Sequence, residues 1–363
     1  MTNMIQAREA SGGPPYVSTS FASIGGRPTV DVDVPICAVL IFVYLVGAIA
    51  NMSIFRLNRR KGHKFLMSWA MFGFCMSRVG THVLRLALAT RPNNARLYIA
   101  ALIFTNIGVL VIYMVLLLLT LRVFRATHPK LGWNRPLGKT FTVSYFLLLG
   151  ALLLVIAFTI LSFYTLNPTL RTVALWIQRA AILYLMIFNV MSLVLLLLSL
   201  LLPRAPDNEN FGTGSMGSKL IVLGVALFFC IFIAGFRTGT AWSAARPASN
   251  PAWYDSKAAF YVILFGFEII IVYLFLFTRF DRMFWVPNGS HKPGDYSQTD
   301  FDSLTARKTS EQEKASEQDK ASEQDKASEQ DKASEQDRAS EQDKASQQDK
   351  ASEQDEASVQ NKV

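Results

Sequence analysis

Histidine and cysteine are scarce in this sequence, and their scarcity excludes several kinds of site. Only 4 histidines occur among 363 residues, and His82 alone lies inside an apolar run, so a metal centre of clustered histidine ligands is not expected. The 3 cysteines lie in or beside apolar runs, which leaves no disulfide framework and no zinc-finger spacing. We therefore predict a chain without a metal site.

Motifs for nucleotide-driven or nucleophilic chemistry are also missing. The sequence contains no glycine-rich phosphate loop and no nucleophile elbow. No lysine lies in the middle of the last apolar run, where a retinal Schiff base would need one, because Lys257 stands at its beginning. The sequence thus assigns no catalytic residue and no cofactor, and it favours a protein that is not an enzyme.

Apolar residues, by contrast, are abundant and gathered into long runs. Hydrophobic residues make up 51% of the chain and charged residues only 17%. A helix needs roughly 20 residues to cross a hydrocarbon core about 30 Å thick, and seven runs are long enough. We predict an all-α polytopic membrane protein, a seven-helix bundle in contact with the lipid bilayer, with helices near 34–55, 65–89, 97–121, 140–166, 172–202, 218–236 and 257–278.

Basic residues flank these runs unevenly, which predicts an orientation. The side of the membrane that holds the first, third and fifth loops and the start of the tail carries 15 Lys/Arg, against 8 on the other side. The positive-inside rule then places the N-terminus outside and the C-terminus in the cytosol. We expect an extracellular segment at 1–33, a transmembrane domain at 34–289 and a cytosolic tail at 290–363. Plasma membrane and endomembrane are not distinguished.

The net charge of +9 averages two unlike parts. Residues 308–363 carry 9 Lys/Arg and 16 Asp/Glu, so residues 1–307 carry 27 basic and 11 acidic residues. In a chain with long apolar runs this basic excess indicates membrane topology, and we expect no nucleic-acid partner. The basic cytosolic loops could instead meet an acidic cytosolic partner.

A KASEQD hexad repeats along the tail from Lys308 onward. A period of six matches neither 3.6 nor 3.5, so the repeat forms no apolar stripe, and its only regular apolar residue is alanine. Such a segment cannot offset the entropy of folding, and we predict that it is disordered. Each SEQD resembles an acid-directed kinase site, but the pattern favours a simpler interpretation, either a helix N-cap fragment or a repeat expansion without a specific role.

The second apolar run, which contains FGFCMSRVGTHVLRLAL at 72–88, carries three basic side chains on one face. Arg78, His82 and Arg85 are spaced i, i+4 and i+7. Arg78 lies about 20 Å from the cytosolic end at 1.5 Å per residue. Arg85 is close enough to the outer boundary to reach the interface. His82 lies between the two arginines, where a neutral imidazole ring is tolerated. A charge near mid-bilayer costs about 2.5–3.5 kcal/mol, so we expect Arg78 to face the interior and to find a partner.

Glu268, in FGFEIII of the last run, is the acid that lies well inside an apolar run. It is about 15 Å from the cytosolic end, within reach of a long arginine side chain at the depth of Arg78. We predict an Arg78–Glu268 pair, with Asn106 and Asn189 in the same polar layer. Two interpretations stay open: the pair locks helix packing, or the layer lines a pocket for a ligand, an ion or a reaction.

Three stretches resemble a known family. They are GHKFLMSWAMFGFCMSRVGTHVLR, ATHPKLGW, and PAWYDSKAAFY followed by FE and RFDRMFWVPNG. Together they resemble a fungal family of seven-helix membrane proteins of unknown function, often labelled "family C-like G-protein-coupled receptor", over about residues 35–290. The resemblance implies a seven-helix bundle and little about activity.

Three functions remain in competition. A receptor-like sensor of a small or lipophilic molecule is favoured by seven helices, an external N-terminus and basic cytosolic loops. A lipid-handling or export protein would share this topology. A membrane-embedded enzyme similar to a terpene cyclase would use Glu268 as a general acid, but an arginine counter-ion favours the ionised carboxylate and argues against that role.

Overall fold

The computed structural model describes residues 13–17, 20–203 and 205–297. The hexad repeats and most of the predicted cytosolic tail lie outside these residues. In this part of the chain the structure is helical and contains no β-strand, only an isolated bridge between Phe21 and Pro247. The long helices are α2 (Val30–Arg60), α3 (Leu66–Thr90), α4 (Ala95–Thr127), α6 (Arg135–Tyr164), α7 (Pro168–Leu201) and α8 (Met216–Trp242).

The last long helical segment is continuous but changes its winding. It consists of α9 (Lys257–Ala259), the π-helical turn η2 (Phe260–Gly266) and α10 (Phe267–Phe277). Short helices lie beside the loops: α5 (Pro129–Gly132), η1 (Trp253–Asp255) and α11 (Phe280–Met283).

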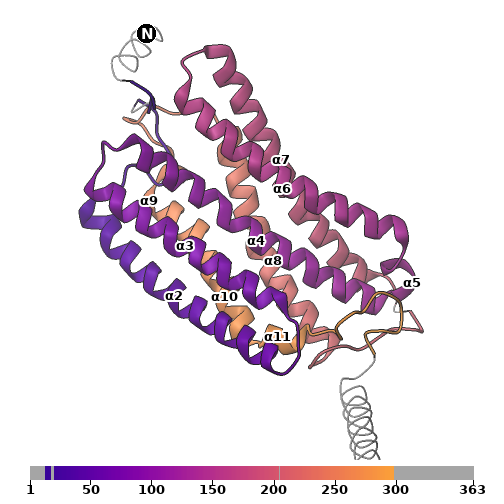
Figure 1. The fold of residues 1–363 in the computed structure, drawn as a ribbon. Helices are drawn as coiled ribbons and strands as arrows, with labels where there is room; N and C mark the ends of the chain where they lie inside the picture. Colours follow the sequence, from indigo (N-terminus) through magenta and orange to yellow (C-terminus); the bar gives the residue numbers. More distant parts are fainter. Residues whose placement is uncertain (1–12, 18–19, 204, 298–363) are drawn as a thin grey trace, which may run out of the picture. The chain divides into compact units, whose positions relative to one another are not determined.

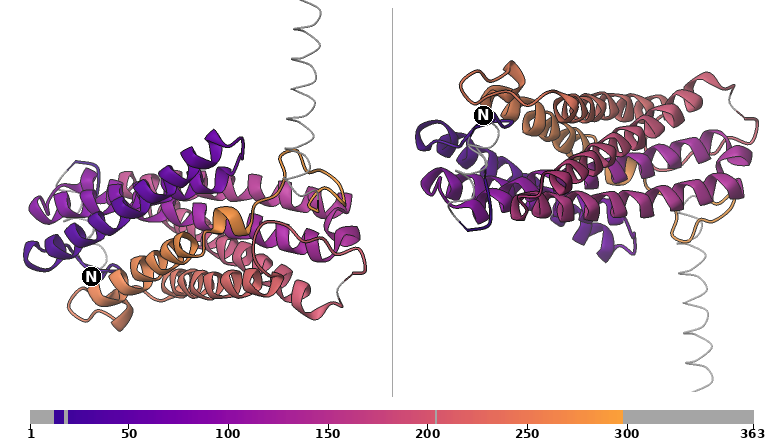
Figure 2. Two further views of the ribbon diagram at one scale, coloured as in Figure 1. Left: turned by 90° about the horizontal axis from the view of Figure 1, so that it is seen from below. Right: turned by 90° about the horizontal axis from the view of Figure 1, so that it is seen from above.

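The helices run side by side, with α4 in the middle (Figure 1). Helix α2 packs on α3, α3 packs on α4, and α4 also contacts α6, α7 and α8. Helix α10 packs against both α2 and α8 and closes the bundle, and Figure 2 shows this arrangement from below and from above. This order leaves α4 with its faces buried against other helices.

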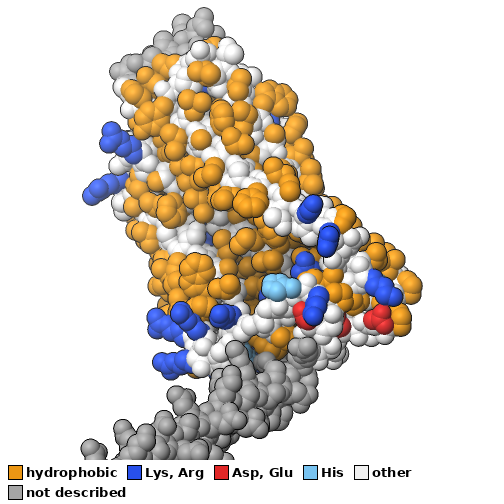
Figure 3. Space-filling model, turned by 45° about the vertical axis from the view of Figure 1, so that its right-hand side comes forward, with side chains coloured by type: hydrophobic (Ala, Val, Ile, Leu, Met, Phe, Trp, Pro, Cys, Tyr) orange, Lys and Arg blue, Asp and Glu red, His pale blue; other side chains and the backbone are white. Residues whose placement is uncertain are grey.

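Within the described residues, six helical segments are long and apolar enough to cross a membrane: α2, α4, α6, α7, α8 and the segment Lys257–Phe277. Their outer faces carry large exposed hydrophobic side chains such as Phe42 and Phe146, and hydrophobic atoms cover most of the face drawn in Figure 3. These are the features of a multi-pass membrane protein with lipid against its surface. The all-α class and the polytopic character predicted from the sequence are confirmed.

Helix α3 is the long helix that fails the same hydropathy test, although it has 25 residues. The polar side chains that lower its hydropathy, Arg78, Thr81, His82 and Arg85, are all buried inside the bundle. These side chains lower the hydropathy average of α3 although they do not lie on its outer surface.

Most of the long helices extend a few residues beyond their predicted runs, and two of these extensions place a charged residue inside a helix. Helix α2 begins at Val30 rather than near 34, so Asp33 lies in its first turn. Helix α8 continues to Trp242 rather than ending near 236, so Arg237 lies inside it. A hydropathy run stops at a charged residue, but the helix continues when that charge has a partner in the bundle.

Candidate functional site

The Arg78 side chain reaches Glu268 across the bundle, joining α3 to α10. Arg78 Nε donates to Glu268 Oε2 at 2.6 Å, and Nη2 donates to Oε1 at 2.5 Å. Both side chains are fully buried. Two parallel charge-assisted bonds of this kind fix the guanidinium in one plane and compensate its charge.

The surroundings of this pair satisfy its remaining polar atoms. Arg78 Nη1 donates to the Thr105 carbonyl oxygen at 3.0 Å, and the Tyr44 hydroxyl donates to Glu268 Oε2 at 3.3 Å. Gly108 on α4 makes room for the guanidinium, because a Cβ at this position would lie 2.8 Å from Arg78 Cζ. The pair is therefore built into the packing of α2, α3, α4 and α10.

A second ionic cluster, which was not predicted from the sequence, lies at the end of the bundle that holds residues 20–28. Arg85 Nε donates to Asp33 Oδ1 at 3.0 Å and to the Tyr261 hydroxyl at 2.9 Å, and its Nη2 donates to the Gly25 carbonyl at 2.7 Å. Asp33 also accepts from Lys257 Nζ at 2.5 Å. Arg85 is thus buried and paired, which overturns the expectation that it reaches the interface.

His82 lies between the two ionic clusters. Its ring centroid is 4.4 Å from that of Phe265, and its ring stacks between those of Tyr44 and Tyr261 at 5.8 and 6.4 Å. It is fully buried, and neither ring nitrogen has a hydrogen-bond partner among the described residues. Here it acts as an aromatic spacer that separates two groups of charges.

The π-helical turn η2 serves both sides of this region. Tyr261 reaches the Asp33 cluster, and the Phe265 carbonyl accepts the Tyr44 hydroxyl at 3.1 Å. Phe260 and Leu264, on the same turn, line a cavity. A π-helical turn shifts the register of the side chains beyond it and is frequent at functional sites.

Arg237 follows directly on the apolar run predicted near 218–236, but its side chain forms hydrogen bonds to α4 inside the bundle. Its Nη1 donates to Asn106 Oδ1 at 2.8 Å, and its Nη2 donates to the Thr105 carbonyl at 3.0 Å. No carboxylate among the described residues lies within ion-pair distance of it, and its buried Nε has no partner there. Arg237 is therefore a partly buried cation held, within the described residues, only by neutral oxygens.

The predicted polar layer is brought together only in part. Asn106 joins it through Arg237, because Arg237 and Arg78 donate to the same Thr105 carbonyl. Asn189 is buried, but it donates to the Leu185 carbonyl of its own helix and makes no hydrogen bond with either arginine. Asn189 is therefore not part of the hydrogen-bonded group.

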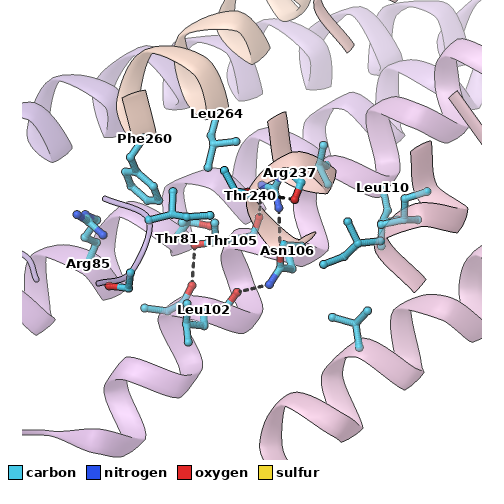
Figure 4. A pocket seen from close by; sticks show the side chains of 18 of the residues that line it. Thr81, Arg85, Leu102, Thr105, Asn106, Leu110, Arg237, Thr240, Phe260 and Leu264 are labelled. Atoms are coloured by element: carbon cyan, nitrogen blue, oxygen red, sulfur yellow. Dashed lines mark hydrogen bonds between the residues drawn. The ribbon is translucent and has the colours of Figure 1, made fainter. Parts of the chain in front are cut away.

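A cavity of about 270 Å³ opens beside Arg237. It lies among α3, α4, α6, α7, α8 and η2, and residues 23–28 also contribute to its wall; Figure 4 shows its lining. Most of the wall is apolar, with polar groups supplied by Thr81, Arg85, Thr105, Asn106, Arg237 and Tyr113 among others. Arg78 and Glu268 are not among the described residues that line it. A concave, mainly apolar space with a few polar groups is typical of a small-molecule site.

Residues 214–285 match the model of a family described as "Protein of unknown function (DUF3112)". The matched part runs from the start of α8 past α11, so it includes Arg237, the π-helical turn and Glu268 but not α3. Of the three stretches that carry the family resemblance in the sequence, the last lies almost wholly inside the match. No curated protein and no solved structure matches the chain.

Proposed function

We propose that this protein is a seven-helix membrane receptor that binds a small lipophilic molecule in the cavity beside Arg237. The observation that carries the proposal is the cavity itself, a mainly apolar space inside the bundle with polar groups along one wall. The wall is formed by several helices and by the π-helical turn, so a ligand there would contact elements that continue to the opposite end of the bundle.

The proposal includes a membrane crossing by α3 and an external N-terminus. Helix α3 packs between the apolar helices α2 and α4, and its buried polar face accounts for its low hydropathy. The basic loops favour a cytosolic position for the end that holds α5 and α11. The cavity, at the end where residues 23–28 lie, would then face outward.

The geometry supports a binding protein over the cyclase-like enzyme. A general acid for cyclisation would need an unpaired carboxyl group that points into the apolar cavity. Glu268 is instead bound to Arg78 through both of its oxygens and is not among the cavity-lining residues described.

Topology can be tested by labelling single cysteines with a membrane-impermeant maleimide. Lys64→Cys and Asn93→Cys probe exposed positions that flank α3. We expect Asn93→Cys to react in intact cells and Lys64→Cys only after permeabilisation. Labelling of both positions from the same side would overturn the crossing by α3.

Ligand binding can be tested with the full chain purified in lipid nanodiscs. Ala101 lines the cavity, and Ala157 on α6 is exposed at the outer face of the bundle, so Ala101→Trp fills the cavity and Ala157→Trp is the matched control. We expect co-purified lipophilic compounds, extracted and measured by mass spectrometry, to be lost only from Ala101→Trp. The same compounds in all three proteins would contradict a cavity ligand.

A further inference from the structure

We infer that the cavity ligand is an amphipathic anion, with its negative head group on Arg237 and an apolar chain along α4 and α7. This inference rests on the proposed ligand site and adds the chemical class of its occupant. It is carried by the charge balance, by the unpartnered polar atoms and by the composition of the cavity wall.

The charge balance of the buried region is positive. Four cationic side chains lie in or beside it, and two carboxylates compensate them, Glu268 for Arg78 and Asp33 for Arg85 and Lys257. Asp33 is thus shared by two cations, and Arg237 has no carboxylate within ion-pair distance among the residues described. An uncompensated cation away from water is costly, and an anion in the cavity would remove that cost.

Two unpartnered polar groups point to the same ligand chemistry. Arg237 Nε and the Tyr113 hydroxyl are both buried, both residues line the cavity, and neither atom has a hydrogen-bond partner in the described part of the chain. Tyr113 is 1% exposed, so its hydroxyl group is cut off from bulk water. A guanidinium and a hydroxyl group are both donors, and a carboxylate can accept from both.

The rest of the wall favours an apolar chain attached to the head group. Two helices line the cavity with aliphatic side chains: α4 contributes Leu102, Val109 and Leu110, and α7 contributes Ile182 and Leu185. No acidic side chain is among the described residues of the wall. A cationic ligand would meet only the excess of positive charge, and a neutral lipid would leave Arg237 uncompensated.

The decisive measurement compares three ligands that differ only in their head group. Decanoate, decan-1-ol and decylamine are titrated against the full chain in nanodiscs by displacement of radiolabelled decanoate, with empty nanodiscs as background. A charge-assisted bond to a partly buried guanidinium predicts decanoate binding tighter than decan-1-ol by about tenfold or more, and no saturable binding of decylamine. This arm uses the unaltered protein, so it does not depend on the folding of a variant.

Variants then assign the head group to Arg237. Arg237→Gln should bring decanoate down to the affinity of decan-1-ol, and Tyr113→Phe should weaken decanoate binding several-fold. The matched control is Arg179→Gln, because Arg179 donates to the Ala241 carbonyl near the end of α8 but does not line the cavity. Equal loss in Arg179→Gln, or no loss in Arg237→Gln, would overturn the assignment.

The outcomes separate this inference from the proposed function. If decan-1-ol binds as tightly as decanoate and both are lost in Ala101→Trp, the cavity is a ligand site and the anionic head group is wrong. If no probe shows displaceable binding, the ligand site itself is wrong, and the inference falls with it.

Discussion

Arg78 and Arg237 are two arginines inside the bundle, one fully and one partly buried, that donate to one carbonyl oxygen and yet differ in charge compensation. Arg78 Nη1 and Arg237 Nη2 each lie 3.0 Å from the Thr105 carbonyl oxygen. Arg78 is held by both oxygens of Glu268, whereas Arg237 has the amide oxygen of Asn106 in the corresponding place. When the charge of a buried cation is compensated by a carboxylate of the same chain, the ion pair holds helices together. When a cation contacts only neutral oxygens, its charge can still be compensated by a bound anion. The polar layer thus has a structural half and a half suited to binding.

Removal of Glu268 should have the largest effect on stability. Glu268→Gln leaves Arg78 buried without a counter-charge, close to a second uncompensated arginine, and we expect a loss of about 3–5 kcal/mol. The double variant with Arg78→Gln should recover part of this loss. Thermal unfolding in nanodiscs, with Arg179→Gln as the control, measures both. If each single variant is no less stable than the double variant, the two side chains are not coupled.

The Asp33 cluster should be the second most sensitive position. Asp33→Asn removes the shared charge from Arg85 and Lys257, but Lys257 is partly exposed and can be solvated, so we expect a smaller loss of about 1–3 kcal/mol. Asp31→Asn is the matched control, because Asp31 lies in the same first turn of α2 and is exposed. Equal destabilisation by the two substitutions would show that the helix terminus, rather than the cluster, accounts for the effect.

The difference between these clusters also explains how much the sequence could reveal. Glu268 and Arg78 stand in the middle of long apolar runs, where a charge has no route to water, so their pairing followed from depth alone. Asp33 and Arg237 stand where an apolar run ends, and there a charge can either reach the interface or turn into the bundle. Which of the two happens depends on tertiary partners, and the sequence does not show them.

Other parts of the site depend on backbone details without a sequence signal. Tyr261 reaches Asp33 from a π-helical turn whose extra residue shifts the register of the last helix, and no hydropathy pattern encodes that shift. The cavity is a property of how α3, α4 and α8 pack. By contrast, the length of the apolar runs directly predicts the helical class and the long apolar helices, and those predictions are confirmed.

Arg237 should contribute little to stability, in contrast to Arg78. Arg237→Gln loses two hydrogen bonds but also removes a partly buried charge that has no carboxylate partner among the described residues, and these changes oppose each other. We expect ligand-free protein to unfold within about 1 kcal/mol of wild type. Added decanoate should then stabilise the wild type, by about 2.7 kcal/mol at 100 times its Kd, and leave the variant unchanged. If Arg237→Gln lowered the free energy of unfolding as much as Arg78→Gln, both arginines would have a structural role.

The smallest effect concerns a carboxylate at the opposite end of the bundle. Asp281 is buried but outside the apolar spans; it accepts from Arg279 at 3.1 Å and from Asn58 at 3.0 Å. Burial raises its pKa, but these bonds outweigh burial and leave the pKa of Asp281 below its ordinary value.

A carboxylate whose pKa is lowered by folding stabilises the protein above the unfolded pKa of about 3.9, and that contribution is lost as the pH falls through the folded value. The melting temperature of wild type should therefore exceed that of Asp281→Asn at about pH 6, and the gap should shrink as the pH approaches about 3. Because Asp33 and Glu268 titrate in both proteins, their contributions largely cancel in this comparison. A gap that stays constant with pH would mean that Asp281 acts through packing, which would set it apart from the interior pairs, where charge compensation decides stability.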